Sequence, residues 1–398
     1  MSWSTVRADQ FCTLITDGTH DSPKPQQSGW KLITSKHLKG HYIDFDSANW
    51  ISEADYLKVI SRSAVEQWDI LFSMIGTIGN IYLEKNPHVE YACKNMGIFK
   101  FSGNKENALW MYYYLRSPQA KAYIQTHLRG STQAYLPLGG LREMPVPVPP
   151  QTVRNEIIAI LRPIDEKIEC NNAINDNLMQ QAVAIFKSWF VEYSPFDGIA
   201  PKEWKTVNLE KITALICRGI APKYSDNSNQ TVINQKCIRD HMIDLSQART
   251  HTPKVINEKW LRFGDLLINS TGDGTLGRTA QVWFQPQNIT VDSHVTIVRP
   301  AKENLIFYIG LWGILHEREI ECLHTGSTGQ TELPKERVKA LELHLPDNGT
   351  LDRFNTLIAP MAAAIISKQN ENNKLATLRD ALLPKLMSGE IDVSAVQL

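Results

Sequence analysis

The chain has 398 residues, of which 42% are hydrophobic and 21% charged, as in an ordinary globular protein with two or three domains. Its 42 Lys and Arg residues are balanced by 42 Asp and Glu residues, so the formal net charge is zero. Proteins that bind nucleic acid by themselves usually have a basic excess. The balance excludes a strongly basic nucleic-acid binder. If this chain binds DNA, we expect a partner to supply much of the contact with phosphate.

Cysteine usage and hydropathy indicate the cellular compartment of the protein. The six cysteines are dispersed without a CxxC pair, which fits neither a disulfide framework nor a zinc site. No apolar run reaches the length of about 18 residues that a membrane helix needs. The first residues lack the basic and apolar regions of a signal peptide. We therefore expect a cytoplasmic protein that makes no membrane contact.

Residues 1–150 are predicted to form a mixed α/β domain. Short apolar segments bounded by Gly, Asn or Asp are typical of strands, and apolar residues spaced by three or four are typical of helices. The expected strands are residues 31–34, 69–73, 78–83 and 97–101, and the expected helices are residues 108–115 and 119–128. The proline-rich segment 144–150 is expected to end the domain, because proline fixes φ and has no N–H donor.

Residues 151–193 are predicted to form a long amphipathic helix. Its apolar residues, such as Ile157 and Leu161, recur at threes and fours, the spacing of one buried stripe. The segment from Pro163 to Phe190 would span about 42 Å as a helix. Polar residues such as Asn171 interrupt the stripe, and Pro163 is a candidate kink.

Residues 194–348 and 349–398 repeat the order of the first two segments. Landmarks such as residues 130–132 and 326–328 recur at an offset of about 196 residues. The expected strands of the second copy are residues 231–233, 265–268, 279–284 and 294–298, followed by a helix near residues 305–315 and a second long helix with a candidate kink at Pro360. Two amphipathic helices that match in pattern most simply pack on each other; the alternative is that each packs on its own domain. The sequence therefore predicts an α/β (α+β) protein with a pseudo-two-fold internal repeat.

Both copies contain a similar ordered set of motifs. The first contains TDGTHDSP at residues 16–23, LITSKHL at 32–38 and DILFSMIGTIG at 69–79. The second contains RGIAPKY at residues 218–224, VINQKCI at 232–238 and GDLLINSTG at 264–272. This set resembles the specificity (S) subunit of type I restriction–modification systems over essentially the whole chain. A short piece such as DGTH is weak by itself, whereas the duplicated, ordered set is specific.

The resemblance implies two target-recognition domains, residues 1–150 and 194–348, each of which reads one half of an interrupted double-stranded DNA site. The helical spacers, residues 151–193 and 349–398, would form an antiparallel coiled coil that sets the unread gap. They would also dock two DNA adenine methyltransferase (M) subunits. Motor–nuclease (R) subunits would join this complex for restriction in phage defence.

We expect no catalysis from the chain itself, and no cofactor or metal. The sequence lacks the [DNS]PP[YFW] tetrapeptide of amino-methyltransferases, a GxxxxGK[ST] phosphate loop and the HExxH and GxSxG motifs. Residues 272–277 match GxGxxG, but a strand is expected after them instead of a helix, which favours a tight glycine turn over a dinucleotide site. Asp17, His20 and Asp21 could form a metal cluster. We favour a turn there, with contact to the DNA backbone second and a metal third.

Loops with hydroxyl, amide and basic side chains are the candidate DNA contacts. Glycine turns expose backbone N–H groups that suit phosphate, Gln can pair with adenine, and Lys and Arg neutralise phosphate. The candidates in the first copy are Thr19, His20, Lys24, Lys36, Thr77, Arg129, Ser131, Thr132 and Gln133. The candidates in the second copy are Arg218, Lys223, Tyr224, Lys236, Thr275, Arg278, Ser327, Thr328 and Gln330. The alternative for each is an ordinary solvated surface position.

Six apolar residues near the helix ends are interpreted as core first and as a methyltransferase-docking surface second. They are Phe186, Trp189, Phe190, Leu382, Leu383 and Leu386. Two rival functions stay open at this point. One is a scaffold with two binding domains on a coiled coil and no DNA; the other is the recognition half of a split methyltransferase–nuclease outside the type I class. Salt-sensitive DNA binding confined to an assembled complex would exclude the scaffold.

Overall fold

The computed structural model describes residues 3–40, 42–272, 274–326 and 331–393. Its contacts divide the chain into two compact units. Unit 1 consists of residues 1–170 and 372–398, and unit 2 consists of residues 171–371. Each unit therefore combines one α/β domain with about half of each of two long helices, α6 (Gln151–Phe190) and α10 (Asn348–Ser388).

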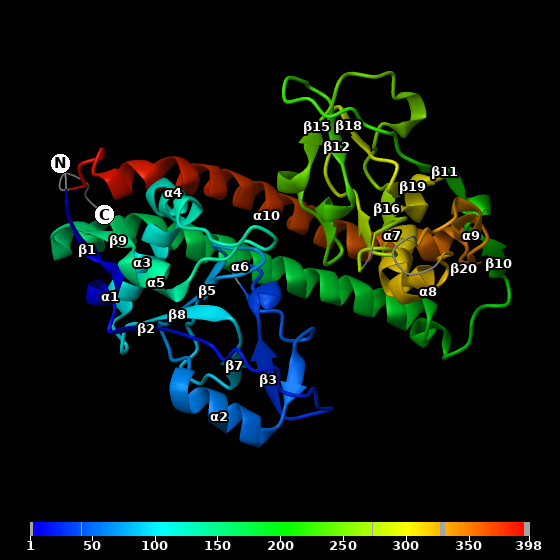
Figure 1. The fold of residues 1–398 in the computed structure, drawn as a ribbon. Helices are drawn as coiled ribbons and strands as arrows, with labels where there is room; N and C mark the ends of the chain where they lie inside the picture. The colour runs from blue at the N-terminus through cyan, green and yellow to red at the C-terminus, as the bar shows by residue number, and fades with distance from the viewer. Residues whose placement is uncertain (1–2, 41, 273, 327–330, 394–398) are drawn as a thin grey trace. The chain divides into compact units, whose positions relative to one another are not determined.

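The α/β domain of unit 1 contains three small sheets (Figure 1). A four-stranded antiparallel sheet has the order β2-β8-β5-β6, a three-stranded sheet has the order β4-β3-β7 with β3 and β7 parallel, and β1 pairs with β9. The strands are β1 (Ser4–Arg7), β2 (Leu14–Asp17), β3 (Trp30–Ile33), β4 (Asn49–Ile51), β5 (Ile70–Ser73), β6 (Ile81–Leu83), β7 (Tyr91–Cys93), β8 (Met96–Lys100) and β9 (Pro145–Val148).

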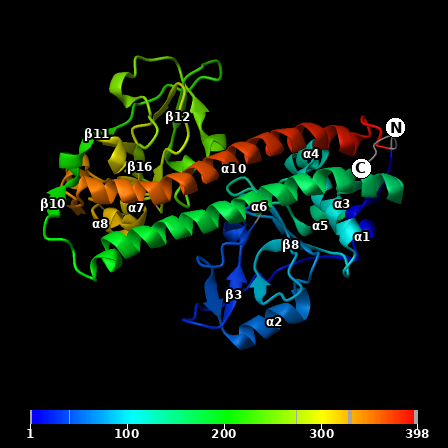
Figure 2. The ribbon, with the colours of Figure 1, turned by 180° about the vertical axis from the view of Figure 1, so that it is seen from behind.

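Two helices of unit 1 begin at side chains that cap them. Asn104 accepts a hydrogen bond from the Asn107 N–H at the start of α3, and Ser117 does the same for the Ala120 N–H of α4. Behind these caps, Trp110 and its neighbours are buried in the core of the unit. The helices are α1 (Ala8–Phe11), α2 (Glu53–Ser63), α3 (Lys105–Arg116), α4 (Pro118–Thr126) and α5 (Leu138–Glu143). Of these, α2 lies on the side of the domain away from α6 (Figure 2).

Unit 2 repeats this topology. Its four-stranded sheet has the order β11-β19-β16-β17, its three-stranded sheet has the order β15-β12-β18, and β10 pairs with β20. Strands β13 and β14 form a hairpin where unit 1 has a bridge between Leu38 and Ile43. Between β15 and β16 a short 3-10 turn, Asn257–Lys259, stands in place of the α-helix α2 of unit 1. The strands are β10 (Lys205–Asn208), β11 (Thr213–Arg218), β12 (Thr231–Ile233), β13 (Ile238–Arg239), β14 (Met242–Ile243), β15 (Arg249–Thr250), β16 (Leu266–Asn269), β17 (Thr279–Gln281), β18 (Ile289–Val291), β19 (Val295–Pro300) and β20 (Glu342–Leu345). The helices are α7 (Ile306–Leu315), α8 (Glu317–Cys322) and α9 (Lys335–Lys339).

The two long helices pack against each other inside each unit (Figure 1). In unit 1, Ile157 near the start of α6 shares a core with Leu386 near the end of α10. In unit 2, Phe186 near the end of α6 contacts Phe354 near the start of α10, with ring centroids 6.0 Å apart. The helices therefore run antiparallel, as predicted. The alternative in which each helix packs on its own domain alone is excluded.

The proline-rich exit of the first domain is a strand, which corrects the expectation that it only ends the fold. Pro145 and Pro147 lie in β9 opposite Arg7 and Thr5 of β1. A two-stranded ribbon has a free edge, so residues without an N–H donor are tolerated at alternate positions. The corresponding exit of the second domain is β20, which pairs with β10.

The sequence prediction also differs from the structure in the extent of some elements and in elements that it did not include, such as α2 and β2. The strands expected at 78–83 and 279–284 are shorter, because residues 76–79 form a turn in which Gly76 and Gly79 have positive φ, and because β17 ends at Gln281. Both long helices continue past Pro163 and Pro360, so neither proline restarts a helix. Within the described ranges, no helix combines the length and apolar character needed to cross a bilayer.

Candidate nucleic-acid interface

The turn after β2 in unit 1 is held close to the backbone of β7 and β8. The Gly18 N–H donates to Met96 O at 2.9 Å, and the Thr19 N–H donates to Cys93 O at 2.9 Å. A Cβ atom on Gly18 would lie 2.3 Å from Cys93 O, so only glycine allows this approach. The turn is thus a fixed base for the residues that follow it.

The turn after β11 in unit 2 is built in the same way. The Gly219 N–H donates to Val295 O at 3.1 Å, and the Ile220 N–H donates to Val291 O at 2.9 Å. A Cβ atom on Gly219 would lie 2.0 Å from Val291 O. The two motifs that look different in sequence, DGTH and RGIA, are therefore the same structural device.

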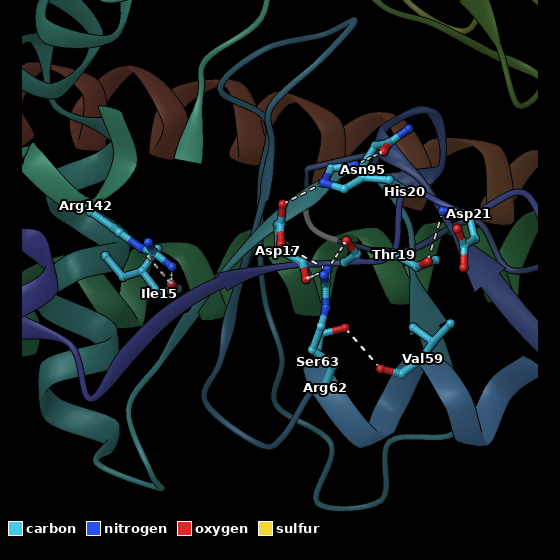
Figure 3. A network of polar contacts seen from close by, with 11 residues as sticks. Ile15, Asp17, Thr19, His20, Asp21, Val59, Arg62, Ser63, Asn95 and Arg142 are labelled. Carbon is cyan, nitrogen blue, oxygen red and sulfur yellow. Dashed lines mark hydrogen bonds and ion pairs between the residues drawn. The ribbon is translucent and has the colours of Figure 1, made fainter. Parts of the chain in front are cut away.

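His20 follows the first turn and is held at both ring nitrogens (Figure 3). Its Nε2 lies 2.9 Å from Asp17 Oδ2, and its Nδ1 lies 2.8 Å from Asn95 Oδ1. Its side chain remains 65% exposed. Thr19 is half-buried, and its Oγ1 accepts a hydrogen bond from the Asp21 N–H at 3.1 Å. No group of three potential metal ligands occurs in the part of the chain that the structure describes.

Lys36 and Lys236 occupy equivalent short 3-10 turns, Ser35–His37 and Gln235–Cys237. Both lysines are exposed, whereas the next residue, His37 or Cys237, is buried. Burial lowers the pKa of His37 to about 4 and raises the pKa of Cys237 to about 11, so both buried side chains are uncharged at neutral pH. Lys24 is also exposed, in the loop before β3.

The glycine turns between β5 and β6 and between β16 and β17 differ in the solvent exposure of their side chains. Thr77 is exposed. Thr275 is half-buried with its Oγ1 3.3 Å from Thr271 O, and the Arg278 Nη2 donates back to Gly274 O at 2.8 Å. After Gly277 the chain enters β17, so the helix that a dinucleotide-binding turn requires is not formed there.

A hairpin near the end of the first domain presents the Gly-Ser-Thr loop of unit 1, and the second domain has an equivalent pair of backbone bonds. Arg129 and Tyr135 exchange backbone hydrogen bonds of 2.9 and 2.8 Å, and Ser131, Thr132 and Gln133 are exposed at the tip. In unit 2, Thr325 and Glu332 exchange bonds of 2.8 and 2.9 Å. The predicted contacts Ser327, Thr328 and Gln330 lie outside the described residues.

Two of these loops are joined by a backbone contact inside each unit. The Leu136 N–H donates to Met74 O at 2.9 Å, which joins the hairpin to the glycine turn of unit 1. The Leu333 N–H donates to Ser270 O at 2.8 Å in unit 2. We call the loops that carry the candidate contacts the interface loops: residues 17–24, 35–39, 74–80 and 129–135 in unit 1, and residues 218–224, 235–239, 270–272, 274–278, 325–326 and 331–332 in unit 2.

Arg218, Lys223 and Tyr224 complete the set in unit 2. The Arg218 guanidinium donates to Leu333 O at 2.9 Å and pairs with Glu332 at 2.5 Å, so it joins its turn to the hairpin. Lys223 is exposed. The ring of Tyr224 is stacked by the Arg249 guanidinium at 3.6 Å, which fixes its orientation while leaving the side chain 39% exposed.

Comparison with known proteins shows which proteins this chain is similar to. The family model "Type I restriction modification DNA specificity domain" matches residues 3–180. The chain is 25% identical over 390 residues to the type I restriction enzyme MjaIX specificity subunit of Methanocaldococcus jannaschii, covering 91% of this chain and 86% of the relative. It is 20% identical to the HindI specificity subunit of Haemophilus influenzae, covering 86% and 90%. Over most of its length the chain is therefore similar to type I restriction–modification specificity subunits.

The fold of this specificity subunit has a solved counterpart. The S subunit from M. genitalium superposes with a TM-score of 0.54 at 13% sequence identity, covering 97% of this chain and 96% of that one. This likeness shows the fold, two α/β domains with a long helix pair. The predicted family, fold class and role as a DNA sequence-specificity subunit are confirmed.

The candidate docking residues of the specificity subunit lie in the cores of their own units. Phe186 and Phe190 are buried beside Phe354 in unit 2, and Leu383 and Leu386 are buried in unit 1. Trp189 and Leu382 are half-buried. Their structural role is therefore packing, and a partner could reach only the two half-buried side chains directly.

Several residues that shape the interface loops escaped the sequence reasoning. Asn95 binds His20, and Arg249 stacks on Tyr224, although no motif links either pair. Arg62 of α2 and Lys259 of unit 2 bind carbonyl groups of the glycine turns. One weak signal existed for Asn95, because Asn readily adopts the left-handed conformation (φ 53°) that it has here.

Proposed function

We propose that this specificity subunit reads a bipartite, interrupted site in double-stranded DNA, with one half-site read by each domain. The observation that supports this is the duplication of the interface loops with different side chains. The same glycine turn is followed by His20 in unit 1 and by Ala221 in unit 2. The same backbone with different side chains predicts two different half-sites.

The proposal retains the boundaries inferred from the sequence. The recognition domains are residues 1–150 and 194–348, and the helical spacers are residues 151–193 and 349–398. Lys24, Lys36, Lys223 and Lys236 are exposed and suit phosphate contact, whereas Gln133 at a hairpin tip suits a base edge. The spacers set the number of unread base pairs between the half-sites.

Catalysis belongs to partner subunits in this proposal. The balanced charge of the chain, 42 basic against 42 acidic residues, argues that the DNA is held by an assembly and not by this subunit alone. We propose that the spacers bind two DNA adenine methyltransferase subunits, and that motor–nuclease subunits join for restriction. Because its substrate is chromosomal and invading DNA, we place the complex in the cytoplasm.

A domain exchange tests the proposal. Replacing residues 1–145 with the corresponding domain of another specificity subunit should change one half-site and preserve the other. The measurement is long-read methylation sequencing of cells that express the exchanged subunit with its native partners. A change in both half-sites would contradict the modular reading.

Two controls accompany the exchange. Deletion of one helical turn from each spacer should alter the gap and neither half-site. Deletion of the whole gene should abolish an interrupted adenine-methylation motif. If methylation is unaffected by deletion and no methyltransferase co-purifies with the chain, the DNA-specificity function is wrong and a protein-binding scaffold takes its place.

A further inference from the structure

The guanidinium group of Arg62 binds the carbonyl oxygens of the glycine turn in unit 1. Arg62, in the last turn of α2, directs its Nη2 at Gly18 O (2.9 Å), Asp17 O (3.0 Å) and Asp17 Oδ1 (3.1 Å) (Figure 3). The Asp17 carboxylate that accepts from Arg62 also faces His20 through its other oxygen. Arg62 thus holds both the backbone of the turn and the side chain that orients His20.

A cation from an unrelated local structure binds the same atom of the turn in unit 2. Lys259 lies at the end of the 3-10 turn Asn257–Lys259, which stands in place of α2 in unit 2. Its Nζ donates to Gly219 O at 3.0 Å. Gly219 corresponds to Gly18, because both donate to the start of β8 or β19 and precede a bridge to the end of β7 or β18.

The N–H and carbonyl groups of these two glycines have different surroundings, and this explains why a cation is needed at the carbonyl oxygen. Their N–H groups and Cα atoms face the backbone of the neighbouring strands at contact distance. Their carbonyl groups point the other way, outside the ladder, and a backbone acceptor needs a donor. A charged donor gives a stronger bond than a neutral one and fixes the peptide plane.

The peptide plane of each glycine sets the direction of the loop that follows. In unit 1 the chain passes from Gly18 to the candidate DNA contacts Thr19, His20 and Lys24; in unit 2 it passes from Gly219 to Lys223 and Tyr224. We propose that Arg62 and Lys259 are positioning residues: each holds the reading loop of its own domain in the DNA-binding conformation and so controls the selectivity of one half-site. This inference rests on the proposed function.

The test measures methylation of genomic sites by the complete complex of specificity subunit and methyltransferase partners. Arg62→Ala should lower the preference for the cognate first half-site over single-base mismatches roughly tenfold, with the second half-site unchanged. Lys259→Ala should have the reverse effect. Each variant is therefore the matched control of the other. Lys211→Ala removes an exposed cation of unit 2 outside the interface loops and should change neither half-site.

A direct phosphate contact is the main competing role, since the Arg62 side chain is 57% exposed. In that case the alanine variant would weaken binding equally for all sequences and reduce the salt dependence by about one counterion, with half-site preference intact. That result, or an equal effect of either variant on both half-sites, would overturn the positioning role. Arg62→Lys and Lys259→Arg retain a cationic donor. If the alanine variants fail to assemble with their partners, Arg62→Lys should retain partial selectivity for the first half-site. Lys259→Arg should retain nearly full selectivity for the second half-site.

The experiment separates this inference from the function on which it rests. If the wild-type complex shows no bipartite methylation motif, the proposed function is wrong. If the wild-type complex methylates such a motif and both alanine variants keep full preference at both half-sites, only the positioning role is wrong.

Discussion

The two units use opposite chemistry at equivalent positions of the same helix pair. In unit 1, Asp165 of α6 accepts hydrogen bonds from Arg379 of α10 (2.9 Å) and Arg116 of α3 (2.7 Å). At the corresponding positions of unit 2, Ala362 and Ala182 are almost completely buried. An ion cluster specifies its partners but loses much stability when one member is removed, whereas small apolar residues pack without directional demands. The same fold therefore accepts either an ion cluster or small apolar residues at this position, provided that every member of the ion cluster is present.

The largest expected effect comes from breaking the ion cluster of unit 1. Asp165→Ala removes the carboxylate that two guanidinium groups share, and Arg379 then keeps only the exposed Asp380. The variant should destabilise unit 1 by about 2 to 3 kcal/mol. The cost is below that of a fully buried pair because the side chains keep some contact with solvent. Chemical denaturation, with hydrogen exchange in α3 and in residues 151–170, measures this loss.

A double variant sharpens the comparison. Asp165→Ala combined with Arg379→Ala places in unit 1 the alanine pair that unit 2 already has, and should recover part of the loss. If the double variant is no more stable than Asp165→Ala, the unpaired charge is not the cause of the destabilisation.

A smaller effect is expected at the equivalent lysines. Lys36→Ala and Lys236→Ala should each weaken DNA binding by the complex roughly threefold and reduce the salt slope by about one counterion, without altering either half-site. Binding titrations at several salt concentrations measure both quantities. An effect of only one of the two lysines would show that the interface loops do not present the same surface to DNA in both units.

The smallest effect concerns an ion pair at the β13–β14 hairpin of unit 2. His241 in its turn lies 3.4 Å from Glu317 of α8. Burial lowers the pKa of His241, but the neighbouring Glu317 carboxylate outweighs this and raises it above its usual value. Burial raises the pKa of Glu317, but the contacts with His241 and Thr279 outweigh this and lower it.

These two shifts define a pH window for the stability of unit 2. The His241 contribution is fully present below its unfolded pKa of about 6.5 and is lost as the pH rises through its higher folded value. The Glu317 contribution is present above about pH 4.5 and is lost on acidification. Unit 2 should therefore gain a few tenths of a kcal/mol near pH 5 to 6 relative to pH 8, after screening. Thermal unfolding of wild type and His241→Gln checks this: the gain should vanish in the variant, and its persistence would exclude this pair as the source.

The sequence alone could predict the repeat, several of the strands and the two long helices. A stripe such as Ile157 and Leu161 depends on a local period of 3.6 residues, so it can be read without knowing the fold. The motifs around Gly18 and Gly219 could also be placed in turns. Glycine is required at positions where a Cβ atom would meet backbone. The strand β9 was missed, because a proline-rich ribbon depends on which chain lies beside it.

Sequence by itself therefore determined the architecture of two domains and two helices and the identity of the loops that follow the glycines. Only the tertiary structure decided what holds those loops. Arg62 and Lys259 act on carbonyl oxygens, which every residue has, so nothing in the sequence marks Gly18 or Gly219 as their targets. The pairing depends on how segments far apart in the chain meet, and a helix in one unit and a single 3-10 turn in the other reach the same atom.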